Sequence, residues 1–194
     1  YCFPPNNIKH VHGVYWDDYD NKLWVTTGDF DGQCYLVTTE DDFNTVEYIG
    51  DGTQMFRSVN LLFNSKSVFW ATDSPIDRNK MFLLDRKTNE INEVYQSFLN
   101  GPVWYMKELQ DGYLLQTSVE KGAAVTTNNV EIYFSSNLKK WERVFSVKKD
   151  FLPYPLFKNG VIAFSDGPQS FDDFICHAEA VQGLDGNSFR VLIK

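Results

Sequence analysis

The hydrophobic positions of this chain fall in short runs that are rich in β-branched and aromatic residues and are separated by clusters of Gly, Asp, Asn and Ser. Runs of this length and composition are typical of β-strands. No segment shows the apolar period of about 3.6 residues that marks an amphipathic helix, so we expect almost no helix. The first quarter of the chain contains four such runs: Val11–Trp16, Leu23–Thr27, Tyr35–Thr39 and Val46–Ile49.

This group of four strands recurs along the chain. Tyr48 in the last strand of the first group corresponds to Tyr95, Val144 and Val191, at steps of 47, 49 and 47 residues. Repeats of about 40–50 residues that contain only strands indicate a β-propeller. A single four-stranded sheet cannot bury both of its faces, so each blade depends on its neighbours. The first strands of the later groups are expected at Ser58–Phe63, Val103–Met106 and Leu156–Phe157.

We therefore predict an all-β fold, a β-propeller with four blades of four antiparallel strands in a single domain or propeller fragment over residues 1–194. The pattern fits a closed four-bladed ring and equally the C-terminal part of a larger propeller. We place the blades at about residues 10–52, 53–101, 102–152 and 153–194.

Polar and aromatic residues occupy two loop positions that open on one face of a propeller. These positions are the entry to the first strand of each blade and the loop after its second strand. His10 and Arg57 are separated by 47 residues, as are Arg57 and Trp104. Residues from different blades would therefore converge on one axial mouth. We expect eight of them to form a site: His10, His12, Asp29, Arg57, Asp73, Trp104, Tyr105 and Glu120.

This set of side chains suits a carbohydrate. Aromatic rings offer flat apolar faces, Arg holds a carboxylate bidentately, and carboxylates serve as acid and base. The alternative is that the acidic residues only cap the backbone of their loops. In the carbohydrate interpretation, catalytic roles fall to Asp29, Asp73, Tyr105 and Glu120. Substrate-binding roles fall to His10, His12, Arg57 and Trp104.

His10 and His12 also raise the question of a metal. Alternation along a strand places both imidazoles on one face, and Asp29 would add a carboxylate to the pair. No further ligand at a fixed spacing is evident in the sequence. We therefore expect no cofactor and no metal, and keep a divalent metal at His10 and His12 as the less favoured alternative.

The turn after the third strand carries a family resemblance. The segment Thr39–Val46 resembles the Asp-box, or BNR repeat, of sialidase-like propellers, whose pattern is Ser/Thr-x-Asp-x-Gly-x-Thr-Trp. Phe43 stands in place of the Gly and Val46 in place of the Trp, while the matching residues are Thr39, Asp41 and Thr45. Ser135–Trp141 and Gly183–Phe189 are similar, more degenerate copies.

The opening stretch, Lys9–Asp17 followed by Trp24–Asp29, is also similar to uncharacterised BNR-like propellers of bacterial polysaccharide loci, and this similarity spans most of the chain. The resemblance implies the fold more firmly than an activity, because such propellers include glycoside hydrolases, polysaccharide lyases and pure binders. The arginine triad and Tyr–Glu pair of sialidases are matched only by Arg57, Tyr105 and Glu120. We expect a protein that recognises a glycan. If it is a glycosidase-like enzyme, it would also cleave that glycan. The alternative is a non-catalytic scaffold for protein–protein interaction.

Composition narrows the choice of partners. The net charge of −8 and the pI of about 4.8 argue against nucleic acid as the main partner. No apolar run approaches the length of about 20 residues that a membrane span needs, so we expect a soluble protein. The three cysteines, Cys2, Cys34 and Cys176, are too widely spaced for a disulfide framework. The sequence leaves open whether the protein is cytoplasmic or secreted, and its oligomeric state.

Overall fold

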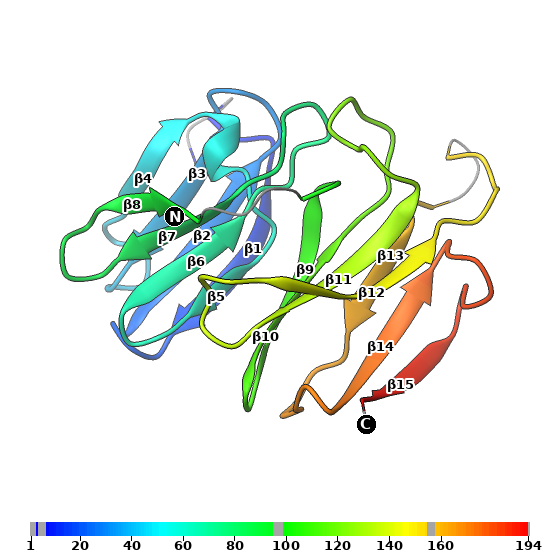
Figure 1. Ribbon diagram of the computed structural model, residues 1–194. Helices are drawn as coiled ribbons and strands as arrows, with labels where there is room; N and C mark the ends of the chain where they lie inside the picture. Colours follow the sequence, from blue (N-terminus) through cyan, green and yellow to red (C-terminus); the bar gives the residue numbers. More distant parts are fainter. Residues whose placement is uncertain (1–2, 4–6, 95–98, 155–157, 194) are drawn as a thin grey trace. The chain divides into compact units, whose positions relative to one another are not determined.

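The computed structural model describes residues 3, 7–94, 99–154 and 158–193. Within these residues the chain forms fifteen strands in four antiparallel sheets, together with a single 3-10 turn (Figure 1). The prediction of an all-β protein with almost no helix is therefore confirmed. The chain divides into two compact units, which are Tyr1–Ser74 with Lys80–Glu93, and Pro75–Asn79 with Val94–Lys194.

The first unit contains two sheets, each of which is a meander in sequence order. The strands of the first sheet are β1 (His10–Asp17), β2 (Lys22–Gly28), β3 (Cys34–Thr39) and β4 (Glu47–Gly52). A 3-10 turn, η1 (Gln54–Phe56), precedes the second sheet. That sheet consists of β5 (Leu61–Phe63), β6 (Ser67–Ala71), β7 (Met81–Asp85) and β8 (Ile91–Glu93).

Side chains from both sheets of the first unit share one hydrophobic core. Trp70 is completely buried and stacks between Phe56 and Phe82, with ring centroids 6.0 and 5.5 Å away. The indole N–H of Trp70 donates to the carbonyl of Met55 at 2.9 Å, so its polar atom is also satisfied. The other buried members of this core are Trp24, Cys34, Leu36, Leu61, Val68 and Leu84.

A buried ion pair accompanies this core. The carboxylate of Asp17, which is fully buried at the end of β1, receives two hydrogen bonds from Arg86, at 2.7 and 2.9 Å. Arg86 lies in the turn after β7, so the pair joins the first sheet to the second. The indole of Trp24 and the backbone N–H of Tyr19 also donate to Asp17. Both oxygens of this buried carboxylate therefore accept hydrogen bonds, which offset the cost of burying a polar group.

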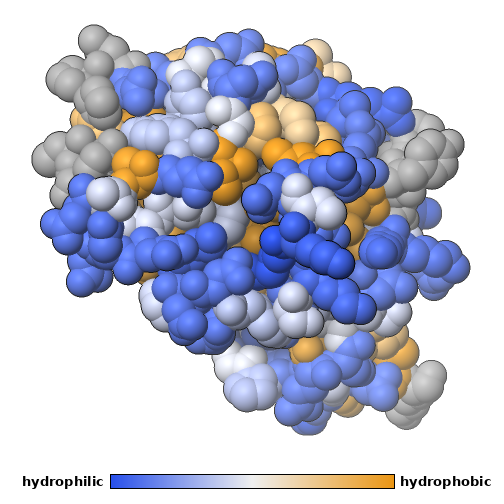
Figure 2. Space-filling model, turned by 90° about the vertical axis from the view of Figure 1, so that its left-hand side faces the viewer, coloured by the Kyte–Doolittle hydropathy of each residue, from blue (hydrophilic) through white to orange (hydrophobic). Residues whose placement is uncertain are grey.

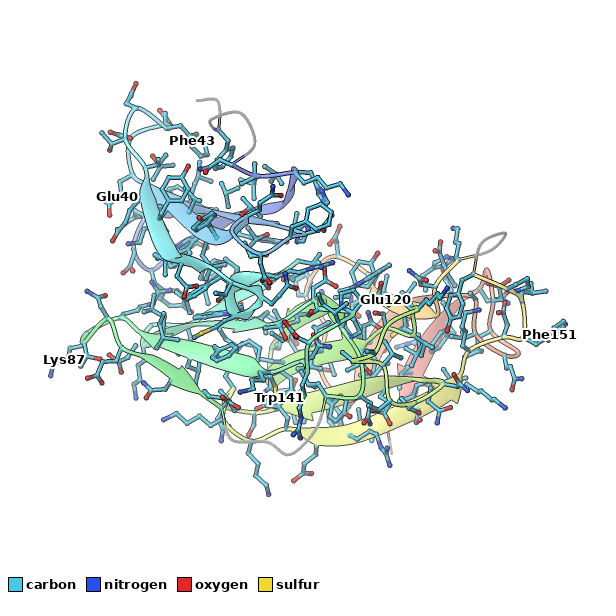
Figure 3. All side chains as sticks on the ribbon, turned by 90° about the horizontal axis from the view of Figure 1, so that it is seen from above. Glu40, Phe43, Lys87, Glu120, Trp141 and Phe151 are labelled. Carbon is cyan, nitrogen blue, oxygen red and sulfur yellow. The ribbon has the colours of Figure 1, made fainter. Side chains whose placement is uncertain are left out.

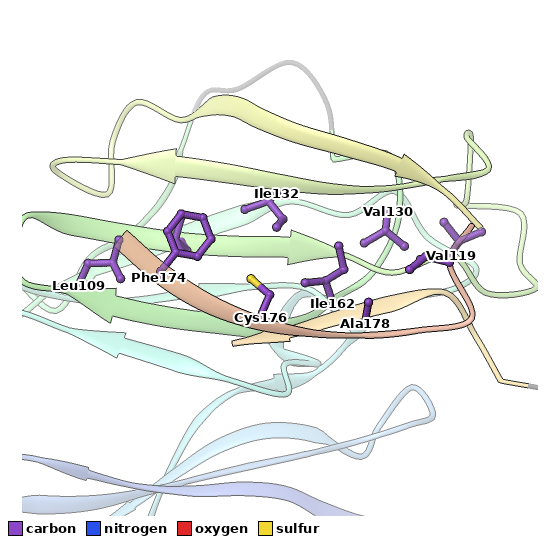
Figure 4. Packing of buried hydrophobic residues seen from close by; sticks show 10 residues of the cluster. Leu109, Val119, Val130, Ile132, Ile162, Phe174, Cys176 and Ala178 are labelled. Atoms are coloured by element: carbon purple, nitrogen blue, oxygen red, sulfur yellow. The ribbon is translucent and has the colours of Figure 1, made fainter. Parts of the chain in front are cut away.

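The second unit also contains two sheets. The third sheet has the order β12-β11-β10-β9, and the fourth has the order β13-β14-β15. Phe174, Cys176 and Ala178 of β14 point toward Val130 and Ile132 of β11, and together they form a completely apolar interior (Figure 4). The strands are β9 (Val103–Leu109), β10 (Gly112–Thr117), β11 (Asn129–Ser135), β12 (Glu142–Lys148), β13 (Val161–Phe164), β14 (Asp173–Glu179) and β15 (Ser188–Leu192).

Two predicted strands differ from the structure. The strand expected at Ser58–Phe63 begins only at Leu61, because the Ser58 hydroxyl donates to the carbonyl of Asn60 and accepts its N–H, and so forms a local turn. The fourth sheet has three strands instead of four among the described residues, and the strand expected at Leu156–Phe157 lies outside them. The division of the chain into four blades of one propeller stays a prediction.

The turns between the third and fourth strands of the sheets are built on Asp and Asn side chains. Asp41 accepts the backbone N–H of Thr45 at 2.9 Å and its hydroxyl at 2.8 Å, while Thr39 donates to Asp41 at 3.0 Å. Phe43, in the position where the motif expects glycine, has a φ of +65°. Asn137 and Asp85 accept backbone N–H groups in the corresponding turns after β11 and β7. Figure 3 shows Phe43 and Lys87 at two of these turns.

Replacing Asp41 with alanine should lower the melting temperature. Hydrogen bonds from the backbone and hydroxyl of Thr45 hold the pKa of Asp41 below its usual value. A carboxyl whose folded pKa is depressed stabilises the fold above its unfolded pKa, about 3.9, and this contribution disappears as the pH falls through the folded value. Calorimetry of wild type and Asp41→Ala should therefore show a difference at pH 7 that shrinks toward pH 2–3. An equal difference at both pH values would contradict this assignment.

No helix in the described residues has the length and apolar character of a membrane span. The face shown in Figure 2 is largely hydrophilic, with apolar residues in small groups.

Cys34 and Cys176 are buried free thiols, and burial raises their pKa to about 11 and about 12. Both therefore remain protonated at neutral pH, which makes them poor nucleophiles. Cys2 lies outside the described residues.

Candidate ligand-binding site

The candidate site begins with an irregularity in the ladder between β1 and β2. The register shifts between Val11 and Gly13, so His12 is the extra residue of a β-bulge, a feature that re-aims side chains and is common beside functional sites. The imidazole of His12 lies against Gly28 at the end of β2. A Cβ atom on Gly28 would be 2.5 Å from Cε1 of His12, so only glycine allows this close approach.

Two hydrogen-bonding contacts fix the ring of His12. Its Nδ1 lies 3.0 Å from the carbonyl oxygen of Ser58, and its Nε2 lies 3.2 Å from Oδ1 of Asp29. A carbonyl oxygen can only accept, so the hydrogen is on Nδ1 and Nε2 is directed at the carboxylate. Burial lowers the pKa of His12, and its contacts with Ser58 and Asp29 offset this only in part. The ring of His12 is thus held by Ser58 with its Nε2 directed at Asp29.

Asp29 is the centre of the cluster. Its carboxylate lies 3.4 Å from Nζ of Lys9, 3.6 Å from Nδ1 of His10 and 3.5 Å from a guanidinium nitrogen of Arg57. Burial alone raises the pKa of Asp29, but the hydrogen bond with His12 and the charges of Arg57 and His10 outweigh this effect. The pKa of Asp29 consequently lies below its usual value, and the group is a carboxylate at neutral pH.

Arg57 links Asp29 to Asp73. It follows η1 directly, and its Nη1 donates to the backbone carbonyl of Asp29 at 3.0 Å. Its Nε lies 3.4 Å from Oδ2 of Asp73, a residue that is only 4% exposed. The side chain of Arg57 is 12% exposed. Arg57 therefore orders the loop after β2 and balances a buried carboxylate, and the idea that it holds a substrate carboxylate stays a prediction.

The structure brings together five of the eight predicted site residues in the first unit: His10, His12, Asp29, Arg57 and Asp73. The other three belong to the second unit. Trp104 and Tyr105 lie on β9, where Tyr105 is 37% exposed, and Glu120 follows the bridge between Val119 and Gly160. The prediction that all eight share one axial mouth remains untested.

The sequence analysis missed two exposed members of the cluster. Lys9 precedes β1, and its ammonium group contacts Asp29 and lies 5.0 Å from the ring centroid of Phe30. Phe30, next to Asp29 in the loop after β2, is 58% exposed. A large apolar side chain inside an otherwise polar turn, Gly28–Gly32, was the available signal for Phe30. No local signal identifies the carbonyl of Ser58 as the partner of His12, because they are 46 residues apart.

The second unit has polar features of its own. A pocket of about 390 Å³ is lined by Asp150, Leu152, Lys158, Glu179, Ala180, Asp185 and Gly186. Its charged groups are paired, since Lys158 binds Glu179 at 2.7 Å and Asp185 accepts the N–H of Ala180. Buried Glu131 likewise accepts hydrogen bonds from Asn100, Tyr133 and Arg143. These ion pairs and hydrogen bonds give the charged groups of the pocket and Glu131 a structural role.

No family model matches the chain, and no curated protein matches it.

Proposed function

We propose that this protein is a glycan-binding β-propeller whose site lies at the ends of β1 and β2. The observation that carries the proposal is the exposed ring of Phe30 beside the partly exposed carboxylate of Asp29, with Lys9 and His10 also exposed. An aromatic face stacks on the apolar face of a sugar, and the charged groups bind its hydroxyls and carboxylates. Sugars that bear carboxylates suit the ammonium group of Lys9 and the nearby guanidinium of Arg57 best.

The propeller architecture rests on repetition. The four sheets are meanders, and three of them have four strands in sequence order. Asp or Asn carboxylate and amide oxygens shape the turn before the last strand in each of the first three sheets. Repeated units that expose apolar faces are stabilised by stacking on one another, which is the arrangement of blades in a propeller.

Binding is favoured over cleavage. Glycoside hydrolysis by the common mechanism uses two carboxylates that both reach the sugar. Asp29 is partly exposed, but Asp73 is buried and bound to Arg57. Of the two carboxylates predicted to be catalytic in the first unit, Asp29 alone is accessible, so this cluster does not supply the pair that the chemistry needs.

A protein-binding scaffold is the second candidate, on the strength of one observation. Val14 and Trp16 are 55% and 52% exposed, and residues two apart on a strand point to the same face. Both lie on β1, which is the edge strand of the first sheet. An apolar pair on an exposed edge strand is a feature of protein-interaction surfaces.

A glycan array separates the two candidates. Wild-type protein should bind acidic oligosaccharides, and Phe30→Ala should weaken the binding at least about tenfold, which corresponds to about 1.4 kcal/mol. Trp16→Ala removes a similarly exposed aromatic near the other end of β1 and should bind as wild type does. If no acidic glycan binds, or if Trp16→Ala loses binding while Phe30→Ala retains it, the proposed site is wrong.

A further inference from the structure

Within the residues that the structure describes, His10, His12 and Asp29 form a group whose potential ligand atoms all lie within 4.8 Å of one another. We propose that these three side chains bind a divalent transition-metal ion of the zinc type. The inference does not depend on the proposed function, because it concerns the affinity of the protein for a metal in the absence of any glycan.

The first argument is geometric. Ligand atoms about 2.0–2.2 Å from zinc, at a tetrahedral angle, lie about 3.3–3.5 Å from each other. Nε2 of His12 and Oδ1 of Asp29 are 3.2 Å apart, and Nδ1 of His10 is 3.6 Å from Oδ2 of Asp29. The imidazole centroids of His10 and His12 are 4.6 Å apart. The two distances end on different oxygens of Asp29, so the half-exposed His10 ring would have to turn for all three residues to share one ion.

The second argument is the support around His12. Ligating histidines commonly donate their other ring N–H to a carbonyl or carboxylate, which fixes the tautomer and the ring orientation. Nδ1 of His12 makes this contact with the carbonyl of Ser58, and it leaves Nε2 as the ligand atom. The 3.2 Å separation between Nε2 of His12 and Oδ1 of Asp29 is close to the spacing of two ligand atoms on one zinc ion.

The third argument concerns the position of Asp29. The guanidinium of Arg57 holds the backbone carbonyl of Asp29, and Gly28 allows the approach of His12. These contacts order the carboxylate before any ion is bound. Three protein ligands, two histidines and one carboxylate, are the number found in zinc sites that keep a fourth position for water or a ligand oxygen, and half-exposed His10 gives the group access to solvent.

Two cations oppose the binding of a metal. Arg57 lies 3.5 Å from Oδ1 of Asp29, and because buried Asp73 also contacts its guanidinium, its charge is only partly available to oppose the metal. Lys9 is 55% exposed and contacts Oδ2 of Asp29, an oxygen that the metal would use. Lys9 and the metal therefore compete for Asp29. Replacing Lys9 with methionine should strengthen metal binding by about 1.5- to 5-fold, the range expected for an exposed ion pair.

The test is a titration of tag-free, EDTA-treated full-length chain with Co²⁺, followed by visible absorption, and then displacement by Zn²⁺. We expect one equivalent to bind. His10→Gln and Asp29→Asn should each weaken binding at least about tenfold, since even outer residues of metal sites contribute 10- to 100-fold. His177→Gln is the matched control, because His177 is the third histidine of the chain and lies on β14.

His10 is half exposed, so His10→Gln should fold as the wild type does, which a circular dichroism melt verifies. Failure of the wild type to bind Co²⁺ or Zn²⁺ would overturn the proposal and leave His12–Asp29 as an ordinary polar contact. Binding that survives His10→Gln and Asp29→Asn, or that is lost in His177→Gln, would overturn it as well. Lost glycan binding with retained metal binding would refute only the proposed function.

Discussion

Replacing Arg86 with methionine is expected to lower the free energy of unfolding by about 3–5 kcal/mol, the usual cost of removing one partner from a buried ion pair. Asp17 is fully buried, and Arg86 supplies its two shortest hydrogen bonds, at 2.7 and 2.9 Å. Without Arg86 the carboxylate retains only the indole of Trp24 and the N–H of Tyr19. Two neutral donors do not compensate a buried negative charge.

A second substitution makes this prediction specific. Asp17→Asn in the Arg86→Met background removes the stranded charge, so the double variant should be more stable than Arg86→Met alone. Lys80→Met is the matched control, because Lys80 pairs with Glu93 at 2.8 Å while both side chains are about half exposed. It should cost less than about 1 kcal/mol. Urea unfolding measures all four proteins, and equal losses for Arg86→Met and Lys80→Met would contradict the assigned role of the buried pair.

Replacing Trp70 with alanine should have an effect of similar size, a loss of about 3–5 kcal/mol. Trp70 is completely buried, and its stacking on Phe56 and Phe82 spans the core of the first unit. Its removal leaves a cavity, and it also deprives the carbonyl of Met55 of its donor. The expected measurement is a lower urea midpoint with an unchanged slope.

Trp16 provides the comparison for Trp70. It is 52% exposed, so Trp16→Ala removes the same side chain with little loss of buried area. The cost should stay below about 1 kcal/mol, as for most surface substitutions. Trp70→Phe should fall between the two, because it keeps a stacked ring but loses the hydrogen bond to Met55. An order of stability other than this would mean that the two sheets do not share the core as described.

Most strands could be predicted because their signal is local. Short runs of β-branched and aromatic residues identify β2 and β3 closely, and the Asx-type turns around Asp41 and Asn137 are encoded in a few adjacent residues. The late start of β5 was not predicted, because a short-range hydroxyl–backbone turn at Ser58 outcompeted a run of good strand formers.

The grouping of three predicted residues could be read from the sequence, but the geometry of their contacts could not. His10, His12 and Asp29 were identified from their positions beside the first two strands, and they do lie together. The bulge at His12, the contact with Ser58 and the bridging role of Arg57 depend on pairings between residues distant in sequence. Such pairings leave no local pattern. Arg57 was expected to face a ligand, yet buried Asp73 holds one side of its guanidinium.

The central claim is that the ends of β1 and β2 form the ligand-binding site. Its most direct test is a ¹H–¹⁵N NMR titration of the protein with a carboxylate-bearing oligosaccharide. The amide signals of His10, Asp29 and Phe30 should shift with saturating behaviour, while those of Val14 and Trp16 should stay in place. Shifts confined to other parts of the chain, or no shifts at millimolar ligand, would contradict it.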